Sequence, residues 1–176
     1  MYKELQRSIL GIEFVKGIPS NIGDDKFFDL SVRNMLVIDD LMSDATKDSR
    51  ICDLFTKGSH HRNLSVLCLL QNLYYQGREN RTMSLNSHYL ILFKNPRDLQ
   101  QINVLGRQMY PNNGDRLLDA FRKATEQPHG YLLVDLKQDT PDDRRLRPNV
   151  LADAKDGEVQ VASPHNARLI AQQQQG

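Results

Sequence analysis

A short run of apolar residues that ends in two adjacent carboxylates constrains this chain more than any other feature. Residues 35 to 38, Met-Leu-Val-Ile, contain no polar side chain and are followed by Asp39 and Asp40. A strand that is apolar throughout is typical of a parallel sheet covered by helices, because both of its sides are buried. The run therefore predicts an α/β fold with two carboxylates at the carboxyl end of a central strand.

Three further apolar runs have the length of buried strands, and we expect them in the same mainly parallel sheet. These runs cover residues 64–70, 89–93 and 131–136. Apolar residues at helical spacing predict helices over about residues 2–9, 44–57, 97–109 and 115–124, with a short strand at 12–15. Helices that alternate with strands are typical of an α/β domain with helices on both faces of its sheet.

Composition changes near residue 150 and divides the chain into a core and a tail. A chain of 176 residues suits one domain with a substantial core, which we place at residues 1–150. Residues 151–176 are largely polar and end in a run of glutamines. Such a segment buries too little apolar surface to offset the entropy lost on ordering. We therefore expect a disordered Gln-rich tail.

Charge and cysteine content narrow the classes of protein to which the chain can belong. The formal net charge is only +1, so nucleic-acid binding would have to come from local basic patches. Two cysteines without a CxxC spacing are too few for a disulfide framework. No stretch approaches the roughly 18 apolar residues of a membrane span, and the charged start does not resemble a secretion signal. We expect a soluble, intracellular protein with no membrane partner.

The paired carboxylates stand where an open α/β sheet binds its ligands, just beyond the carboxyl end of a strand. In nucleotide hydrolases, an acid at this position holds Mg²⁺ and the following acid polarises the attacking water. The alternative is structural, with Asp39 capping the next helix and Asp40 solvated. The residues alone leave both interpretations open.

Two other side chains flank the second apolar run. Gln71 follows its end, where an amide can sense a γ-phosphate or orient water, or can satisfy backbone groups. Arg62 precedes its start, where a guanidinium can stabilise a transferring phosphoryl group or remain solvated. His60 and His61 have no third ligand at a spacing that would indicate a metal site.

Basic residues elsewhere give a weaker signal. Arg144, Arg145 and Arg147 form a basic cluster, which neighbouring aspartates offset. Mixed charge of this kind favours a solvated face. The sequence contains no GxxxxGK[ST] motif, and the segment GIPSNIGDD lacks both the lysine and the spacing that would cradle phosphates.

Five segments, in this order, resemble the FtsK-HerA superfamily of genome-packaging ATPases. They are residues 35–40, GSHHRN at 58–63, the strand that ends at Gln71, RTMSLNSHYLILFKNPRD at 81–98 and GYLLVDLK at 130–137. The chain is most similar to the packaging ATPases of Maverick/Polinton elements, adintovirus-like sequences and poxviruses. The resemblance covers roughly residues 2–150.

The resemblance implies a RecA-like sheet of the ASCE-type P-loop NTPases, in a ring-forming motor. Such a motor uses ATP and Mg²⁺ to drive double-stranded DNA into a capsid. The expected partners are double-stranded DNA, further copies of the chain in a ring, and capsid or portal proteins. The implied location is the nucleus or a viral assembly site.

The resemblance also assigns roles residue by residue. Asp39 resembles the Walker B acid, which binds the Mg²⁺ of the nucleotide, and Asp40 the catalytic acid that activates water. Gln71 resembles the sensor on the neighbouring strand. Arg62 resembles the arginine that is offered to the nucleotide of the next subunit.

One departure from the family pattern is large. Family members carry a phosphate-binding loop upstream of the matched part, and this chain begins after that loop. The strand that leads into the loop lies between the last strand and the sensor strand of the fold. We therefore expect a gap or an exposed edge beside the sensor strand, and a fragment that is inactive alone.

Two other functions remain open. The chain could be a non-catalytic module, a decayed or domesticated ATPase that retains subunit or DNA contacts. It could also be a small α/β nuclease that binds metals through Asp39 and Asp40, although no further acidic residue lies at a recognisable spacing.

Overall fold

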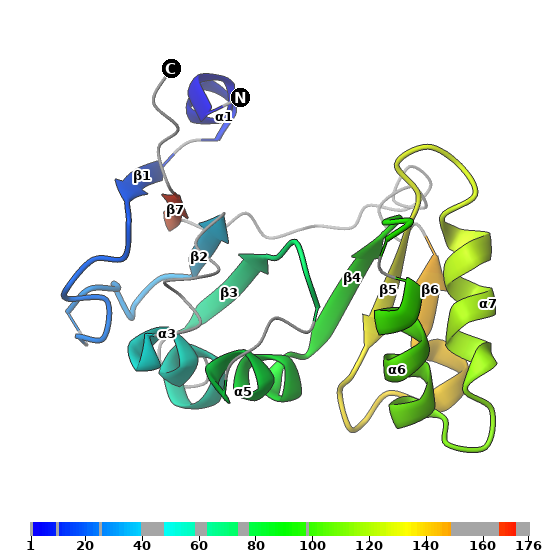
Figure 1. Ribbon diagram of the computed structural model, residues 1–176. Coiled ribbons are helices and arrows are strands. Elements are labelled where there is room, and N and C mark those ends of the chain that lie inside the picture. The colour runs from blue at the N-terminus through cyan, green and yellow to red at the C-terminus, as the bar shows by residue number, and fades with distance from the viewer. Residues whose placement is uncertain are drawn as a thin grey trace. The chain divides into compact units, whose positions relative to one another are not determined.

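The computed structural model (Figure 1) describes residues 2–9, 11–24, 26–39, 48–58, 63–73, 78–97, 99–148 and 166–171. Its internal contacts divide the chain into two compact units, which are described separately below. Unit 1 comprises Met1–Asn86 and Ala162–Gly176, and unit 2 comprises Ser87–Val161. The expected single core of residues 1–150 is thus divided, and part of the expected tail belongs to unit 1. No helix in the described ranges has the length and apolar character needed to cross a membrane.

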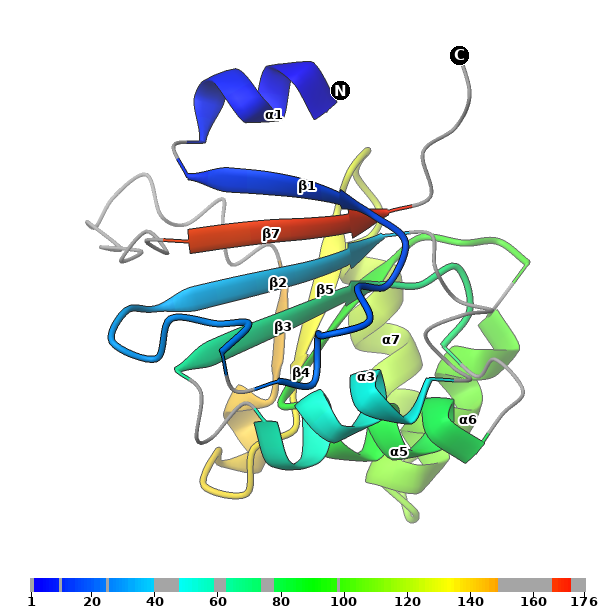
Figure 2. The same cartoon turned by 90° about the vertical axis from the view of Figure 1, so that its left-hand side faces the viewer.

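Unit 1 is built on a sheet of four parallel strands, which Figure 2 shows one below another. Their order is β1 (Ile12–Lys16), β7 (Asn166–Ala171), β2 (Asn34–Asp39) and β3 (Leu64–Leu69). β2 and β3 pair in parallel over their whole lengths. The predicted α/β class and the pairing of the first two apolar runs are therefore confirmed.

The strand β7 contradicts the expectation of a wholly disordered tail. It lies between β1 and β2 and pairs in parallel with both. Leu169, Ile170 and Ala171 are buried. Arg168 forms an ion pair with Glu13 of β1, with 2.9 Å between its Nε and the carboxylate. The average composition of the tail concealed a six-residue strand whose pairing partners lie more than a hundred residues away in the sequence.

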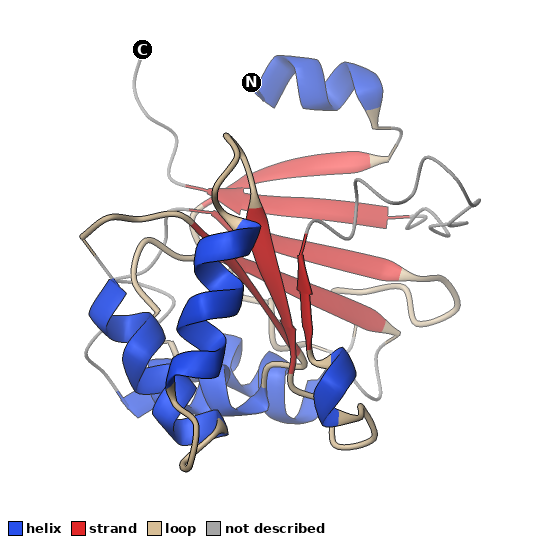
Figure 3. Cartoon of the chain, turned by 90° about the vertical axis from the view of Figure 1, so that its right-hand side faces the viewer, coloured by secondary structure: helices blue, strands red, loops and turns tan. Residues whose placement is uncertain are grey.

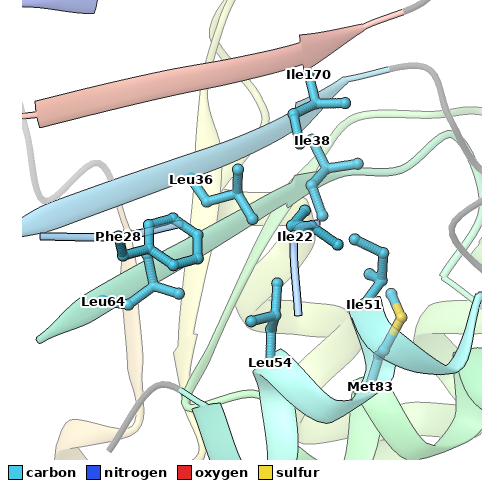
Figure 4. Close-up of a cluster of buried hydrophobic side chains, with 9 residues drawn as sticks. All are labelled: Ile22, Phe28, Leu36, Ile38, Ile51, Leu54, Leu64, Met83 and Ile170. Carbon is cyan, nitrogen blue, oxygen red and sulfur yellow. The ribbon is translucent and has the colours of Figure 1, made fainter. Parts of the chain in front are cut away.

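The core of unit 1 lies against one face of this sheet, as Figure 4 shows. The helices that contribute to it are α3 (Ser49–Asp53), the π-helical turn Leu54–Gly58 and α5 (Arg78–Asn86). Asp48 caps α3 by accepting the backbone N–H of Arg50 at 2.9 Å. The core side chains are Ile22, Phe28, Leu36, Ile38, Ile51, Leu54, Leu64, Met83 and Ile170. The helix α1 (Tyr2–Ser8) lies beside β1.

The opposite face of the sheet is more open than the apolar sequence predicts. Side chains alternate along a strand, so the even-numbered residues of β3 face the core and the odd-numbered ones point away from it. On the outward side, Leu67 and Leu69 are 39% and 45% exposed. The expectation that β3 is buried on both faces is therefore wrong.

β3 is also the last strand of its sheet. In the described part of unit 1 it pairs only with β2. Among the described residues, the strand that ends at Gln71 thus lies at an edge of its sheet, where the prediction places an exposed edge; whether a strand is missing there stays a prediction.

Unit 2 contains a separate antiparallel sheet. Its order is β4 (Tyr89–Phe93), β5 (Tyr131–Asp135) and β6 (Leu146–Pro148). The prediction that residues 89–93 and 131–136 join the parallel sheet of β2 and β3 is therefore wrong. An apolar run indicates burial, but it specifies neither the neighbour nor the direction of a strand.

Two helices separate β4 from β5 in the chain, and Figure 3 shows them beside the strands of unit 2. α6 (Leu99–Met109) packs against α7 (Asp115–Ala124), which also contacts β5 and β6. A Cβ atom added at Gly106 of α6 would collide with the carbonyl of Gly114, so the two helices approach closely there. The predicted helices at about residues 97–109 and 115–124 are therefore confirmed. A single 3₁₀ turn, Asp142–Arg144, precedes β6.

Candidate functional site

The parallel strands of unit 1 bring polar residues to one edge of the sheet, because all four strands end on the same side. Asp39, the last residue of β2, pairs with Leu69 of β3 on one side and with Ala171 of β7 on the other. Ala171 in turn pairs with Lys16, the last residue of β1. The carboxyl ends of all four strands therefore form one line.

Asp39 and Gln71 lie at this edge on neighbouring strands. Gln71 follows the end of β3 by two residues and is exposed, while Asp39 is half-buried. Adjacent strands of a sheet are about 4.8 Å apart. The structure thus brings together these two predicted site residues, at the edge where open α/β sheets bind ligands.

The other two predicted catalytic residues, Asp40 and Arg62, lie outside the described residues, as do His60 and His61. In the sequence, Asp40 directly follows β2 and Arg62 precedes Asn63 and the start of β3. Their assigned roles stay predictions.

Lys16 is a cation that sequence reasoning did not single out. It is exposed, and residues in register on parallel strands point to the same side of a sheet, so Lys16 shares a face with Asp39. One strand, β7, separates them, which sets their backbones roughly 10 Å apart. Only the parallel placement of β1 and β7 reveals that these two charged residues share a face, because nothing local in the sequence marks a lysine at a strand end.

The chain leaves β1 through a glycine with a left-handed backbone. Gly17 has φ 66°, a value that side chains disfavour, and its N–H donates to the carbonyl of Ala171 at 3.2 Å. No atom lies within 4 Å of the place where a Cβ would sit. The conformation at Gly17 therefore allows the chain to turn away from the edge immediately after Lys16.

Among the described residues at this edge, Asp39 is the side chain that could bind a metal ion. Nowhere in the described ranges do three His, Cys, Asp or Glu side chains gather as a metal cluster would require. Mg²⁺ is commonly held by one or two carboxylates together with substrate phosphates and water. One carboxylate at a strand end fits that arrangement, with the phosphates supplied by a nucleotide.

Unit 2 contains an ion pair between a buried carboxylate and a partly exposed arginine, which sequence reasoning missed. Asp135, which is 1% exposed, accepts a hydrogen bond from Arg147 and another from the backbone N–H of Lys137 at 3.1 Å. Burial acts to raise the pKa of Asp135. The hydrogen bonds from Lys137 and Thr140 and the charges of Lys137 and Arg147 outweigh burial and lower that pKa.

Arg145 is a second arginine that contacts the chain just after the carboxyl end of β5. Arg145 donates to the carbonyl of Lys137 at 2.7 Å and pairs with the carboxylate of Asp142 at 2.8 Å. The basic cluster read as a solvated face thus includes two arginines that hold β5, β6 and the connecting turn together. The sequence places Asp and Arg residues close together here, but it does not indicate which of them form ion pairs.

Comparison with protein-family models, curated protein sequences and solved structures found no match to this chain.

Proposed function

We propose that this chain is part of an ATP-driven motor of the FtsK-HerA class that moves double-stranded DNA into a capsid. The observation that carries the proposal is the position of Asp39 and Gln71 at the carboxyl ends of neighbouring parallel strands. A RecA-like motor places its metal-binding acid and its sensor in this relation. The resemblance over residues 2–150 supplies the rest of the assignment.

In this proposal, each residue has a distinct task. Asp39 holds the Mg²⁺ of MgATP, which neutralises phosphate charge, and Asp40 accepts a proton from the attacking water. Gln71 hydrogen-bonds to the γ-phosphate or the water through its amide. Arg62 acts on the nucleotide of the next subunit in a ring.

The edge of β3 that has no strand partner among the described residues offers a place for the segment that would bind the phosphates. Natural sheet edges carry charges, prolines or bulges that prevent pairing, because unpaired backbone groups recruit other strands. Residues 64–70 contain neither a charged residue nor a proline. This unprotected edge supports the proposal that a further strand, followed by a phosphate-binding loop, pairs with β3 in the working motor.

The test requires the chain together with such a segment. Genomic and transcript sequence upstream of Met1 is searched for an in-frame GxGK[ST] about one βα unit earlier, and the longer protein is expressed. We expect ATP hydrolysis that double-stranded DNA stimulates, and we expect Asp40→Asn to abolish it. Asp53→Asn is the matched control, since Asp53 is exposed on α3 and its substitution should leave hydrolysis intact.

Two results would contradict the proposal. A longer protein that binds MgATP but hydrolyses it equally with and without the Asp40 carboxylate would exclude the assigned mechanism. A transcript and promoter that define Met1 as the natural start would favour the non-catalytic module instead.

A further inference from the structure

The strand β4 forms an edge of the unit 2 sheet, and its backbone shows which residues face outward. In the described part of unit 2, β4 pairs only with β5. The N–H of Leu136 donates to the carbonyl of His88 at 2.8 Å, whereas the N–H of Asp135 points the other way, to Arg145. Hydrogen bonding alternates along an antiparallel strand. The odd-numbered residues of β4 therefore direct their N–H and C=O groups toward the free edge.

The same odd-numbered residues have exposed apolar side chains. Tyr89, Ile91 and Phe93 are 46%, 44% and 62% exposed. Residues 89–93 include no charge and no proline, the usual protections of an edge strand. The edge of β4 thus combines unpaired backbone groups with apolar side chains, which favours pairing with another strand.

The sequence of β4 is complementary to itself. Tyr-Leu-Ile-Leu-Phe reads as aromatic, Leu, Ile, Leu, aromatic in both directions. An antiparallel pairing about a two-fold axis at Ile91 would set Ile91 against Ile91 of a second copy. It would also set Tyr89 against the second copy's Phe93, at both ends of the pair. Aromatic residues directly opposite one another across strands stabilise a sheet.

We propose that β4 pairs with β4 of a second copy of this chain, so that two three-stranded sheets join into one antiparallel sheet. The two-fold pairing uses the outward backbone groups of Tyr89, Ile91 and Phe93 in both copies. The edge strand β3 of unit 1, by comparison, reads Leu-Ser-Val-Leu-Cys-Leu and lacks this symmetry. The proposal is independent of the proposed function, because it rests on unit 2 alone.

The expected dimer is weak, since a five-residue edge buries less than a standard interface. We expect a dissociation constant in roughly the micromolar range, seen as concentration-dependent association of the full chain in sedimentation experiments. Ile91→Lys would place two like charges opposite each other and remove the apolar contact between the two isoleucines, which should weaken association roughly tenfold or more. Leu67→Lys is the matched control, because Leu67 is similarly exposed but lies on β3.

Disulfide crosslinking tests the register, in chains whose Cys52 and Cys68 are replaced by Ser and Ala. Ile91→Cys should crosslink to itself on mild oxidation, since opposed residues of a hydrogen-bonded pair have Cα atoms about 5.5 Å apart, within disulfide range. Tyr89→Cys should crosslink with Phe93→Cys. It should not crosslink with itself, because four residues of strand offset the two positions by roughly 13 Å.

Several results would overturn the proposal. A chain that stays monomeric up to its solubility limit would exclude the dimer. Equal weakening by Ile91→Lys and Leu67→Lys would place the contact elsewhere. Crosslinking of Tyr89→Cys to itself as fast as to Phe93→Cys would exclude this register. Binding of a single-stranded oligonucleotide by a monomer, lost in Ile91→Lys, would assign the exposed aromatic face to nucleic acid instead.

Discussion

Single residues of this chain were predictable where their position depends on local sequence. Asp39 ends a run of four apolar residues, and a strand end is a local property, so its place at a sheet edge followed from the sequence. Asp135 ends a similar run, yet it is buried and forms an ion pair with Arg147, twelve residues later on another strand. No sequence pattern distinguishes a carboxylate that faces solvent from one that meets a distant arginine.

The first prediction concerns Asp39 and nucleotide binding. We expect the chain alone to show no ATP turnover and only weak affinity for ATP, because its sequence lacks the glycine-rich loop and lysine that cradle phosphates. Any magnesium-dependent part of the binding should be lost in Asp39→Asn and kept in Asp53→Asn. Calorimetry that finds low-micromolar, magnesium-dependent ATP binding would contradict this expectation.

The second prediction concerns the pH dependence that Asp135 gives to unit 2. Its pKa is lower in the folded chain than in the unfolded one, so its contribution to stability is present above about pH 4 and is lost as pH falls through the folded pKa. Asp135→Asn should cost about 2 kcal/mol at neutral pH, the usual value for hydrogen bonds to a charged group.

Urea denaturation at pH 7 and pH 3 checks this prediction. The free energy of unfolding should fall less on acidification in Asp135→Asn than in the unsubstituted chain. Asp139→Asn, at an exposed aspartate nearby, should behave like the unsubstituted chain. An identical acid dependence in all three proteins would show that Asp135 does not contribute as described.

At the scale of elements, the strands of the four apolar runs and the helices α6 and α7 were predictable, whereas α5, β6 and the sheet partners were not. The apolar spacing of α6 and α7 identified both helices within a few residues. The strand β7 escaped notice because six residues are too few to shift the composition of a polar tail. β7 is stabilised by pairing with β1 and β2 on either side. The sequence of the tail alone does not reveal these partners.

The third prediction tests the central position of β7. Ile170 is fully buried between β1 and β2, so Ile170→Ala should lower the free energy of unfolding of unit 1 by about 2–5 kcal/mol. Ile9→Ala removes the same atoms at a site that is 39% exposed and should cost under about 1 kcal/mol. Denaturant unfolding followed by circular dichroism gives both values. Equal, small losses would show that β7 does not complete the sheet.

At the scale of the whole molecule, the sequence predicted one sheet, whereas the described residues form two. A parallel sheet in unit 1 carries the candidate edge, and in the antiparallel sheet of unit 2 the edge strand β4 pairs only with β5 among the described residues. The apolar runs showed which segments are strands. Their division between two sheets depends on long-range pairing, which periodicity does not encode.

The length of β3 bears on how Arg62 could act in a ring of subunits. β3 has six residues and spans about 20 Å, and Arg62 precedes its amino end while Gln71 follows its carboxyl end. In the sequence, the whole length of β3 therefore separates Arg62 from Gln71. A ring motor resolves this by offering the arginine of one subunit to the nucleotide of the next, where such a residue can be worth about 10³-fold or more in rate.

Mixing two inactive variants tests most directly whether this chain supplies hydrolytic residues to a ring motor. Arg62→Ala and Asp40→Asn are prepared in the protein that includes the upstream phosphate-binding segment, and each should be inactive alone. In an equal mixture, about a quarter of the interfaces would join an intact arginine to an intact acid, so ATP hydrolysis should partly return. Mixed rings that are confirmed to assemble but hydrolyse no ATP would contradict the proposed function of Arg62 in trans.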